Sequence, residues 1–301
     1  MAAIPDNHNV FAGAFVDRFG ERRKDPEWVA RALDDPKSRY LPVFGELCLL
    51  GGDPPAARLL GREQVAPFID SPDEIVFLGL FNQRPTFALG LSADETPAFA
   101  DEGEFMDLRR AGTILPADEA NLVAHARALV LWHQSQLYCG RCGSATRPDA
   151  GANMRRCTNP DCGASQFPRV DPAIIVLVSD GERCLLGRQA SWPEARYSTI
   201  AGFVEPGESL EDAVRREVYE ETNIRVGDVR YASSQPWPFP SSLMLGFYAD
   251  ALSTDIVRND GELEDARWFT RAELGGDFPK LPFGISIARR LVDGWIDGTD
   301  G

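Results

Sequence analysis

The sequence predicts an α+β fold in three parts: an N-terminal α+β domain, a small four-cysteine ribbon and a C-terminal α/β/α sandwich with a mixed sheet. Three observations lead to this prediction. Apolar residues recur with period two between residues 39 and 91, four cysteines gather between 139 and 162, and strand patterns surround an amphipathic helix after residue 170. We therefore expect domains at 1–115, 116–168 and 169–301.

Composition argues against several classes of protein. The chain has 301 residues, 44% of them hydrophobic and 26% charged, which is typical of a globular protein long enough for two or three domains. Its formal net charge of -15 argues against a DNA partner, because coating nucleic acid needs a positive field. The sequence shows no long apolar run, secretory leader or peroxisomal address. We expect a cytoplasmic protein without membrane contact.

The first part alternates between polar turns and short apolar segments. We predict strands over 41–50, 57–60, 74–81 and 85–91, and helices over 27–33 and 116–137. Asn82 and Gln83 separate the last two strands and predict a hairpin turn. No motif in this part indicates chemistry.

Two cysteine pairs follow the second helix. Cys139 and Cys142 are separated by two residues, Cys157 and Cys162 by four, and fourteen residues lie between the pairs. In a reducing compartment such pairs favour a tetrahedral thiolate zinc site over disulfides. Four sulfur ligands leave no open position, so we expect one structural Zn²⁺ per chain. A nucleic-acid contact or a redox switch is less favoured, because the arginines near the pairs are too few for a basic platform.

The third part predicts a sheet flanked by helices. Strands are expected over 173–178, 184–188, 197–203, 224–231, 243–249 and 266–269, and helices over 210–222 and 285–296. This order fits a mixed sheet with a helix on each face.

The helix over 210–222 has clear boundaries. Ser209, followed three residues later by Asp212, forms a variant of the capping box and starts the helix at Leu210. Asn223 is expected to end it in the left-handed conformation, which asparagine tolerates better than most residues. The helix is therefore about three and a half turns long.

Three acids make this helix unusual. On a helical wheel, one face carries the apolar Leu210, Ala213 and Val214 and the acidic Glu217, Glu220 and Glu221. Carboxylates at this spacing repel one another, and an ordinary surface helix would turn them to solvent. A cation bound between them would offset the repulsion. Mg²⁺ and Mn²⁺ prefer oxygen ligands and leave positions for water and phosphate, so we predict one of them here.

The spacing of this region resembles the Nudix box of the Nudix hydrolase family. The matching residues are Gly202, Glu208, Arg216, Glu217, Glu220, Glu221 and the apolar Ile224. The sequence departs from the family at Asn223, which replaces the usual glycine. The resemblance implies hydrolysis of a nucleoside diphosphate linked to another group, with two or three Mg²⁺ or Mn²⁺ ions per site.

The resemblance also implies catalytic and metal-binding roles. Glu217 and Glu221 are the expected metal ligands, and Glu220 lies close by with a water-mediated contact. Glu221 is also expected to orient or deprotonate the attacking water. The carbonyl group of Ala201 is expected to complete a metal shell.

Further positions of the family pattern support these acids. Glu262 is the expected distal metal ligand, with Glu264 as the alternative because it lies only two residues away. The family pattern gives Gly202, Glu208 and Arg216 structural roles. In that pattern, Arg216 pairs with Glu208 and holds the loop before the helix.

A second resemblance comes from the stretch Ser234-Gln-Pro-Trp-Pro-Phe-Pro-Ser-Ser242. Three prolines alternate with aromatic residues, so we expect a stiff loop that presents rings and cannot join a strand ladder. Directly after a Nudix box, this stretch resembles the signature of the NADH pyrophosphatase subfamily, which also carries an N-terminal domain and a four-cysteine zinc ribbon. The resemblance implies hydrolysis of NADH or NAD⁺ to AMP and nicotinamide mononucleotide, and removal of an NAD cap from the 5′ end of RNA.

The same resemblance implies the substrate contacts. Phe203 and Phe167 are expected to stack on the base, with Phe167 from a second subunit, because the subfamily shares its active site across a homodimer. The other expected contacts are Gln235, Pro236, Trp237, Pro238, Phe239, Pro240, Ser241, Ser242 and the backbone of Ala288.

Two alternative functions stay open at this point. One is a Nudix hydrolase of another dinucleotide such as ADP-ribose. The other is a non-catalytic regulator that binds nucleotides or RNA. The complete set of mutually repelling acids argues against the regulator, because a domain that only binds has no reason to keep all three.

Overall fold

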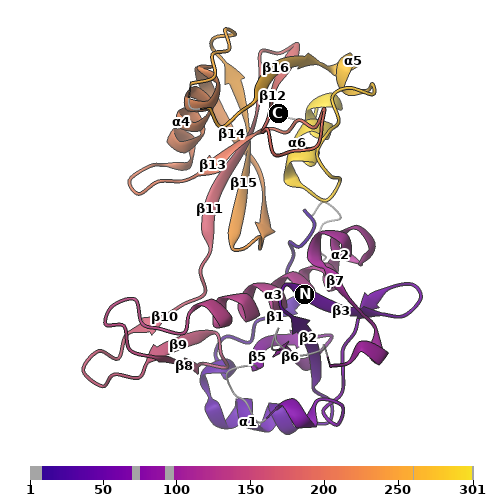
Figure 1. Ribbon diagram of the computed structural model, residues 1–301, viewed down its shortest axis with the longest axis vertical. Coiled ribbons are helices and arrows are strands. Elements are labelled where there is room, and N and C mark those ends of the chain that lie inside the picture. Colours follow the sequence, from indigo (N-terminus) through magenta and orange to yellow (C-terminus); the bar gives the residue numbers. More distant parts are fainter. Residues whose placement is uncertain (1–8, 70–74, 92–97, 260, 300–301) are drawn as a thin grey trace. The chain divides into compact units, whose positions relative to one another are not determined.

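The computed structural model describes residues 9–69, 75–91, 98–259 and 261–299. The chain divides into two compact units, and Figure 1 labels most of their helices and strands. The first unit comprises Met1–Arg169 together with the short segment Pro238–Ser241, and the second comprises Val170–Trp237 and Ser242–Gly301. The finer division into three domains stays a prediction.

The first unit is built on a mixed sheet. Its described elements are β1 Val16–Asp17, η1 Arg22–Lys24, α1 Pro26–Asp34, β2 Arg39–Phe44, β3 Leu47–Gly51, β4 Ala56–Ala57, η2 Ala66–Phe68, β5 Ile75–Phe81, β6 Arg84–Leu91, η3 Ala100–Glu102, β7 Glu104–Asp107, α2 Leu108–Ile114 and α3 Ala117–Ser135. In the described residues, the strand order is β1-β5-β6-β2-β3-β4, with β7 beside β3. Strands β2 and β6 are parallel and form the middle of the sheet.

Most elements predicted for this unit are confirmed. Asn82 and Gln83 both have positive φ angles, of 49° and 62°, as the predicted hairpin turn requires. The segment predicted as one strand over 41–50 is two strands, because the chain reverses at Gly45 with a φ angle of 56°. Helix α2 is absent from the sequence-based prediction, since seven residues carry little periodicity. Glu74, at the start of one predicted strand, lies outside the described residues.

Helix α3 is the long helix predicted over 116–137. It packs against β5, β6 and β2, and most of its side chains are buried. Its N-cap residue is Pro116, which makes no side-chain cap bond. The buried set includes three polar side chains, Asn121, Arg127 and His133.

The four cysteines belong to a small separate sheet in the first unit. It consists of β8 Thr146–Asp149, β9 Met154–Cys157 and β10 Ser165–Gln166, in the order β10-β9-β8 with antiparallel pairing. Cys139 and Cys142 precede β8, Cys157 ends β9, and Cys162 lies in the turn between β9 and β10.

The second unit contains a second mixed sheet. Its described elements are β11 Asp171–Ser179, β12 Arg183–Arg188, β13 Ile200–Phe203, α4 Leu210–Thr222, β14 Val226–Trp237, β15 Ser242–Ala251, β16 Asp265–Thr270, α5 Arg271–Leu274 and α6 Ile287–Ile296. The strand order among the described residues is β14-β15-β11-β12-β16, with β13 beside β11. Strand β11 is parallel to β15 and antiparallel to both β12 and β13.

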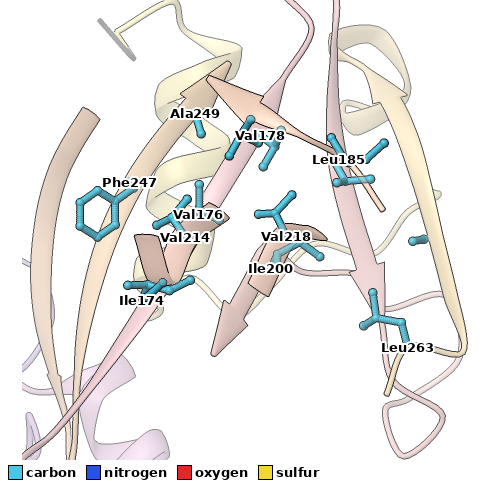
Figure 2. Close-up of a cluster of buried hydrophobic side chains, with 14 residues drawn as sticks. Ile174, Val176, Val178, Leu185, Ile200, Val214, Val218, Phe247, Ala249 and Leu263 are labelled. Carbon is cyan, nitrogen blue, oxygen red and sulfur yellow. The ribbon is translucent and has the colours of Figure 1, made fainter. Parts of the chain in front are cut away.

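Two hydrophobic clusters cover the two faces of this sheet. Alternate residues of β11, Ile174, Val176 and Val178, join Ala213, Val214 and Val218 of helix α4 in the cluster shown in Figure 2. The intervening Ile175 and Leu177 join Ile287, Leu291 and Trp295 of helix α6. Because successive side chains of a strand point to opposite faces, α4 and α6 pack on opposite sides of the sheet. The predicted α/β/α sandwich is confirmed.

The proline-aromatic stretch differs from the prediction. Its first half, Ser234–Trp237, belongs to β14 and pairs with Ser242–Leu245 of β15. Pro236 therefore lies in a ladder, opposite Leu243, and the expectation that these prolines cannot join one is wrong. Strand β14 is an edge strand of the described sheet, and an edge strand tolerates proline because one of its sides has no ladder partner.

Helix α4 has the predicted boundaries. The Ser209 hydroxyl accepts a bond from the Asp212 N–H at its start, and Asn223 ends it with a φ angle of 62°. In the part of the chain that the structure describes, no helix has the length and apolarity needed to span a membrane.

Candidate active site and metal centre

Arg216 on α4 joins the helix to the loop and strand before it. Its Nε and Nη2 atoms donate to the two carboxylate oxygens of Glu208 at 2.5 and 2.9 Å, and Nη2 also donates to the Phe203 carbonyl at 2.9 Å. The same Glu208 carboxylate accepts the Glu205 N–H at 3.0 Å. Glu208 and Arg216 thus hold the turn between β13 and α4 in one conformation, and the two-pronged ion pair gives that turn a defined geometry.

Arg216 also contacts two of the acids on α4. Its Nη1 atom donates to Glu217 at 2.9 Å and to Glu220 at 3.1 Å. The three acids differ in exposure: the Glu220 side chain is 51% exposed, that of Glu217 is 13% exposed and Glu221 is 4% exposed. A buried carboxylate costs free energy when it is charged, and a bound cation reduces that cost. The exposure of the three acids therefore decreases from Glu220 through Glu217 to Glu221.

Gly202 leaves the space that the Glu217 side chain occupies. A Cβ atom at Gly202 would overlap the carboxylate carbon and both carboxylate oxygens of Glu217. Strand β13 therefore needs a glycine at this position so that the acid can lie against its backbone. The neighbouring Ala201 is exposed on the same strand, and Phe203 at its end is 59% exposed.

The electrostatic surroundings of Glu217 bring in an acid from outside the helix. Burial raises the pKa of Glu217, the hydrogen bond and charge of Arg216 oppose that rise, and the negative charges of Glu220 and Glu262 raise it further. Glu262 is exposed, and its neighbour Leu263 is buried in the core beneath helix α4. A group of negative charges that raise one another's pKa in this way attracts a divalent cation.

Glu264, the alternative distal acid, has a different partner. Its carboxylate forms an ion pair with Arg188 on β12 at 2.5 Å. The charge of Glu262 therefore acts on Glu217 of the acidic helix, whereas Glu264 is paired with Arg188.

Gln235 of β14 is buried. Its amide nitrogen donates to the Ile285 carbonyl at 2.7 Å, and its amide oxygen accepts the Ile287 N–H at 2.8 Å. The side chain therefore joins β14 to the start of α6. Ala288, the next residue of α6, is also buried.

The expected substrate contacts are divided between the two units. Trp237 and Ser242 are partly exposed and face each other as the last pair of the β14–β15 ladder. Pro238–Ser241, the tip between those strands, belongs to the first unit, as does Phe167, which is 67% exposed just after β10.

The four ribbon cysteines converge. Their sulfur atoms all lie within 4.8 Å of one another, with Cys142 and Cys157 at 3.4 Å and Cys139 and Cys162 at 3.9 Å. Zinc–sulfur bonds of about 2.3 Å in a tetrahedron would place the sulfurs about 3.8 Å apart. The arrangement fits a structural zinc ion and leaves no position for a substrate.

Sequence reasoning missed the structural roles of two residues. Gln235 was expected to contact substrate, and its partners on α6 are 50 and 52 residues away in the sequence. No sequence-based prediction concerns Arg127, although its place between Ala124 and Leu131 on the apolar face of a helix indicates the burial that the structure shows.

The fold and the site define a class of protein. An acidic helix packed on a mixed sheet, held by an arginine–glutamate pair and supplemented by a distal acid, is suited to binding divalent cations and hydrolysing a phosphoanhydride. The chain belongs to the Nudix hydrolase family and has the domain architecture of NADH pyrophosphatases. Residues 168–291 match a NUDIX domain, 37–132 an NADH pyrophosphatase-like rudimentary NUDIX domain and 134–167 an NADH pyrophosphatase zinc ribbon domain.

Similar proteins support this assignment over most of the chain. An NAD-capped RNA hydrolase NUDT12 from Macaca fascicularis is 35% identical over 97% of this chain and 74% of its own length. An NAD-capped RNA hydrolase NudC from Deinococcus radiodurans is 45% identical over 73% of this chain and 76% of its own length. An NAD-capped RNA hydrolase NudC from Mycobacterium bovis is 42% identical over 74% of this chain and 76% of its own length. The matched N-terminal domain, which the sequence suggested only as α+β, is thus itself related to the Nudix fold.

Proposed function

We propose that this protein hydrolyses the pyrophosphate of NADH or NAD⁺ to AMP and nicotinamide mononucleotide, and that it removes NAD caps from the 5′ end of RNA. The observation that carries the proposal is the acidic face of α4, where Glu217, Glu220 and Glu221 lie at graded depth beside Arg216. The relatives named NAD-capped RNA hydrolases support the choice of substrate.

The chain's own residues would perform distinct steps. Two or three Mg²⁺ or Mn²⁺ ions would neutralise the phosphates and lower the pKa of an attacking water. Glu217 and Glu221 would hold these ions, together with the Ala201 carbonyl and Glu262, while the more exposed Glu220 acts through water. Glu221 would orient the attacking water or take its proton.

Exposed aromatic residues would bind the base. Phe203 presents its ring at the end of β13, beside the glycine that accommodates Glu217. Stacking of a base on an aromatic ring is worth about 1–3 kcal/mol. Phe167 would supply the second ring from a partner subunit, so we propose a homodimer with a shared active site. Trp237, Ser242 and the backbone of Ala288 would complete the site.

A substrate panel tests the function. Purified protein is incubated with NADH, NAD-capped RNA and ADP-ribose in the presence of Mg²⁺ or Mn²⁺, and the products are separated by liquid chromatography. We expect AMP and reduced nicotinamide mononucleotide from NADH, and RNA with a 5′ monophosphate from the capped RNA. Cleavage of ADP-ribose without cleavage of NADH would replace this proposal with the other dinucleotide hydrolase.

A variant separates the chemistry from binding. Glu221→Gln keeps the size of the side chain and removes its charge, so it should bind NADH while releasing almost no AMP. Turnover of none of the substrates by the unmodified protein would favour the nucleotide-binding regulator instead.

A further inference from the structure

The tip of the β14–β15 hairpin contacts Phe11, Arg109 and Arg127 within the first unit, and Glu46 in turn contacts Arg127. We call these four residues the tip socket. They come from the segment before β1, the β2–β3 turn, α2 and α3. The tip itself, Pro238–Ser241, is the second half of the proline-aromatic signature.

Arg127 binds the backbone of the tip. It is 1% exposed on α3, and its Nη1 atom donates to the Pro238 carbonyl. Its Nε and Nη2 atoms donate to the carbonyl and carboxylate of Glu46 at 2.9 and 2.8 Å. A buried guanidinium loses its bonds to water and needs other acceptors for its N–H groups. The Pro238 carbonyl is one of these acceptors and so reduces the free-energy cost of burying Arg127.

Phe239 is held by its ring. The guanidinium carbon of Arg109 lies 3.8 Å from the ring centroid and that of Arg127 lies 4.9 Å away. The ring of Phe11 lies 6.4 Å away at an angle of 60°. Phe11 is itself fixed, because it is buried and its carbonyl accepts a bond from Asn121 at 2.6 Å. The Phe239 ring thus has cationic and aromatic partners in the same unit.

We propose that the tip socket is a positioning device for the substrate hairpin, and that Phe239 is its anchor rather than a substrate contact. Trp237 and Ser242 flank the tip directly in the chain and form the last pair of the β14–β15 ladder. A tip held in one conformation presents the residues beside it at a lower entropic cost on binding. This inference rests on the proposed function, in which Trp237 and Ser242 contact the dinucleotide.

Arg109 offers a test that spares the fold. It is exposed, so Arg109→Leu removes the cation over Phe239 without emptying the core. Arg109→Lys retains a cation, and Arg110→Leu is the matched control, because the adjacent Arg110 is also exposed and pairs with Glu104 outside the socket. The readouts are hydrogen exchange of the peptide 236–242, the dissociation constant of AMP measured by calorimetry, and KM and kcat for NADH.

We expect Arg109→Leu to speed exchange of that peptide and to raise both KM and the AMP dissociation constant by about 2- to 10-fold, with kcat nearly unchanged. Arg109→Lys should lie between Arg109→Leu and the unmodified protein, and Arg110→Leu should match the unmodified protein. Unchanged exchange in Arg109→Leu, or equal effects of Arg110→Leu, would overturn the anchor. Faster exchange with unchanged KM and AMP affinity would overturn the positioning role.

The same experiment distinguishes this inference from the proposed function. If the unmodified protein fails to hydrolyse NADH, the proposed function is wrong. Exchange and AMP affinity then still decide whether Arg109 and Phe239 position the hairpin.

Discussion

At the scale of single residues, the acidic site depends on a residue that has no side chain. Gly202 lets the Glu217 carboxylate lie where a Cβ atom would otherwise be. The acid in turn bonds to Arg216, which holds Glu208 and the carbonyl of Phe203. One guanidinium therefore connects the strand, the loop and the acidic face of the helix.

Gly202→Ala should displace Glu217 and weaken catalysis. Because a displacement of about 1 Å at a catalytic group can cost roughly 10²-fold, we expect a fall in kcat/KM of about 10- to 100-fold and a higher Mn²⁺ requirement. Steady-state kinetics over a series of Mn²⁺ concentrations measures both. Gly284→Ala is the control, since its Cβ would meet nothing within 4 Å. Equal activity of the two variants would contradict the packing argument.

The Glu208–Arg216 pair should make stability depend on pH in a defined window. The hydrogen bonds from Arg216 lower the pKa of Glu208 from 4.5 to about 2. A carboxyl group whose pKa falls on folding stabilises the protein above its unfolded pKa and loses that contribution as pH falls towards its folded pKa. The urea midpoints of the unmodified protein and Glu208→Gln should therefore converge between pH 4.5 and pH 2. A constant difference over that window would contradict the assignment.

The residues that could be predicted from sequence are those whose partners are close in sequence. Glu208 and Arg216 are only eight residues apart and both belong to the Nudix box, so their ion pair could be predicted from the spacing of that motif. Gln235 and Arg127 could not be predicted, because they bond to groups 50 and 111 residues away. A local pattern does not show that a glutamine bonds to a helix that begins 52 residues further along the chain.

At the scale of elements, helix α4 was predictable because both its ends and its faces are encoded locally. Ser209 caps its start, and its apolar residues lie four and three residues apart on the face that meets β11. Strand β14 was predicted only to Tyr231, whereas it continues to Trp237. Proline normally ends a strand, and only its tertiary context as an edge strand permits this extension.

The end of α4 supplies a stability prediction. Asn223 has a φ angle of 62°, where a residue with a Cβ is strained and glycine is not. Asn223→Ala should lower the free energy of unfolding by about 1 kcal/mol, whereas Asn223→Gly should keep it within about 0.5 kcal/mol. Urea denaturation of both variants measures this difference. Equal destabilisation by glycine and alanine would contradict the backbone explanation.

At the scale of the whole molecule, two metal centres with different tasks are expected. The four cysteines form a site without an open coordination position, whereas the acids of α4 range from the buried Glu221 to the exposed Glu220. Zinc should therefore exchange slowly and Mg²⁺ or Mn²⁺ quickly. The three-part architecture was predictable because the ribbon and the C-terminal part each carry a motif, but the kinship of the N-terminal domain with the Nudix fold was not, since that domain has no Nudix box.

Metal analysis tests this separation. After dialysis against EDTA, the unmodified protein should retain one zinc ion per chain and no Mg²⁺ or Mn²⁺. Cys142→Ser should lose zinc and become cleavable by protease within residues 139–166, because a thiolate site contributes directly to folding. Cys48→Ala, which changes a buried cysteine of β3, should retain its zinc. Full zinc content in Cys142→Ser would contradict the four-sulfur site.

The most direct test of the central claim is the rate of AMP release from NADH by Glu221→Gln compared with Glu211→Gln. Both residues lie on α4, but Glu221 is buried in the acidic face, whereas Glu211 is exposed in the first turn. If the acidic face binds the catalytic ions, kcat/KM should fall by about 10²- to 10⁴-fold in Glu221→Gln and remain near its original value in Glu211→Gln. Comparable activity of the two variants, with circular dichroism showing both folded, would contradict the assignment of α4 as the catalytic helix.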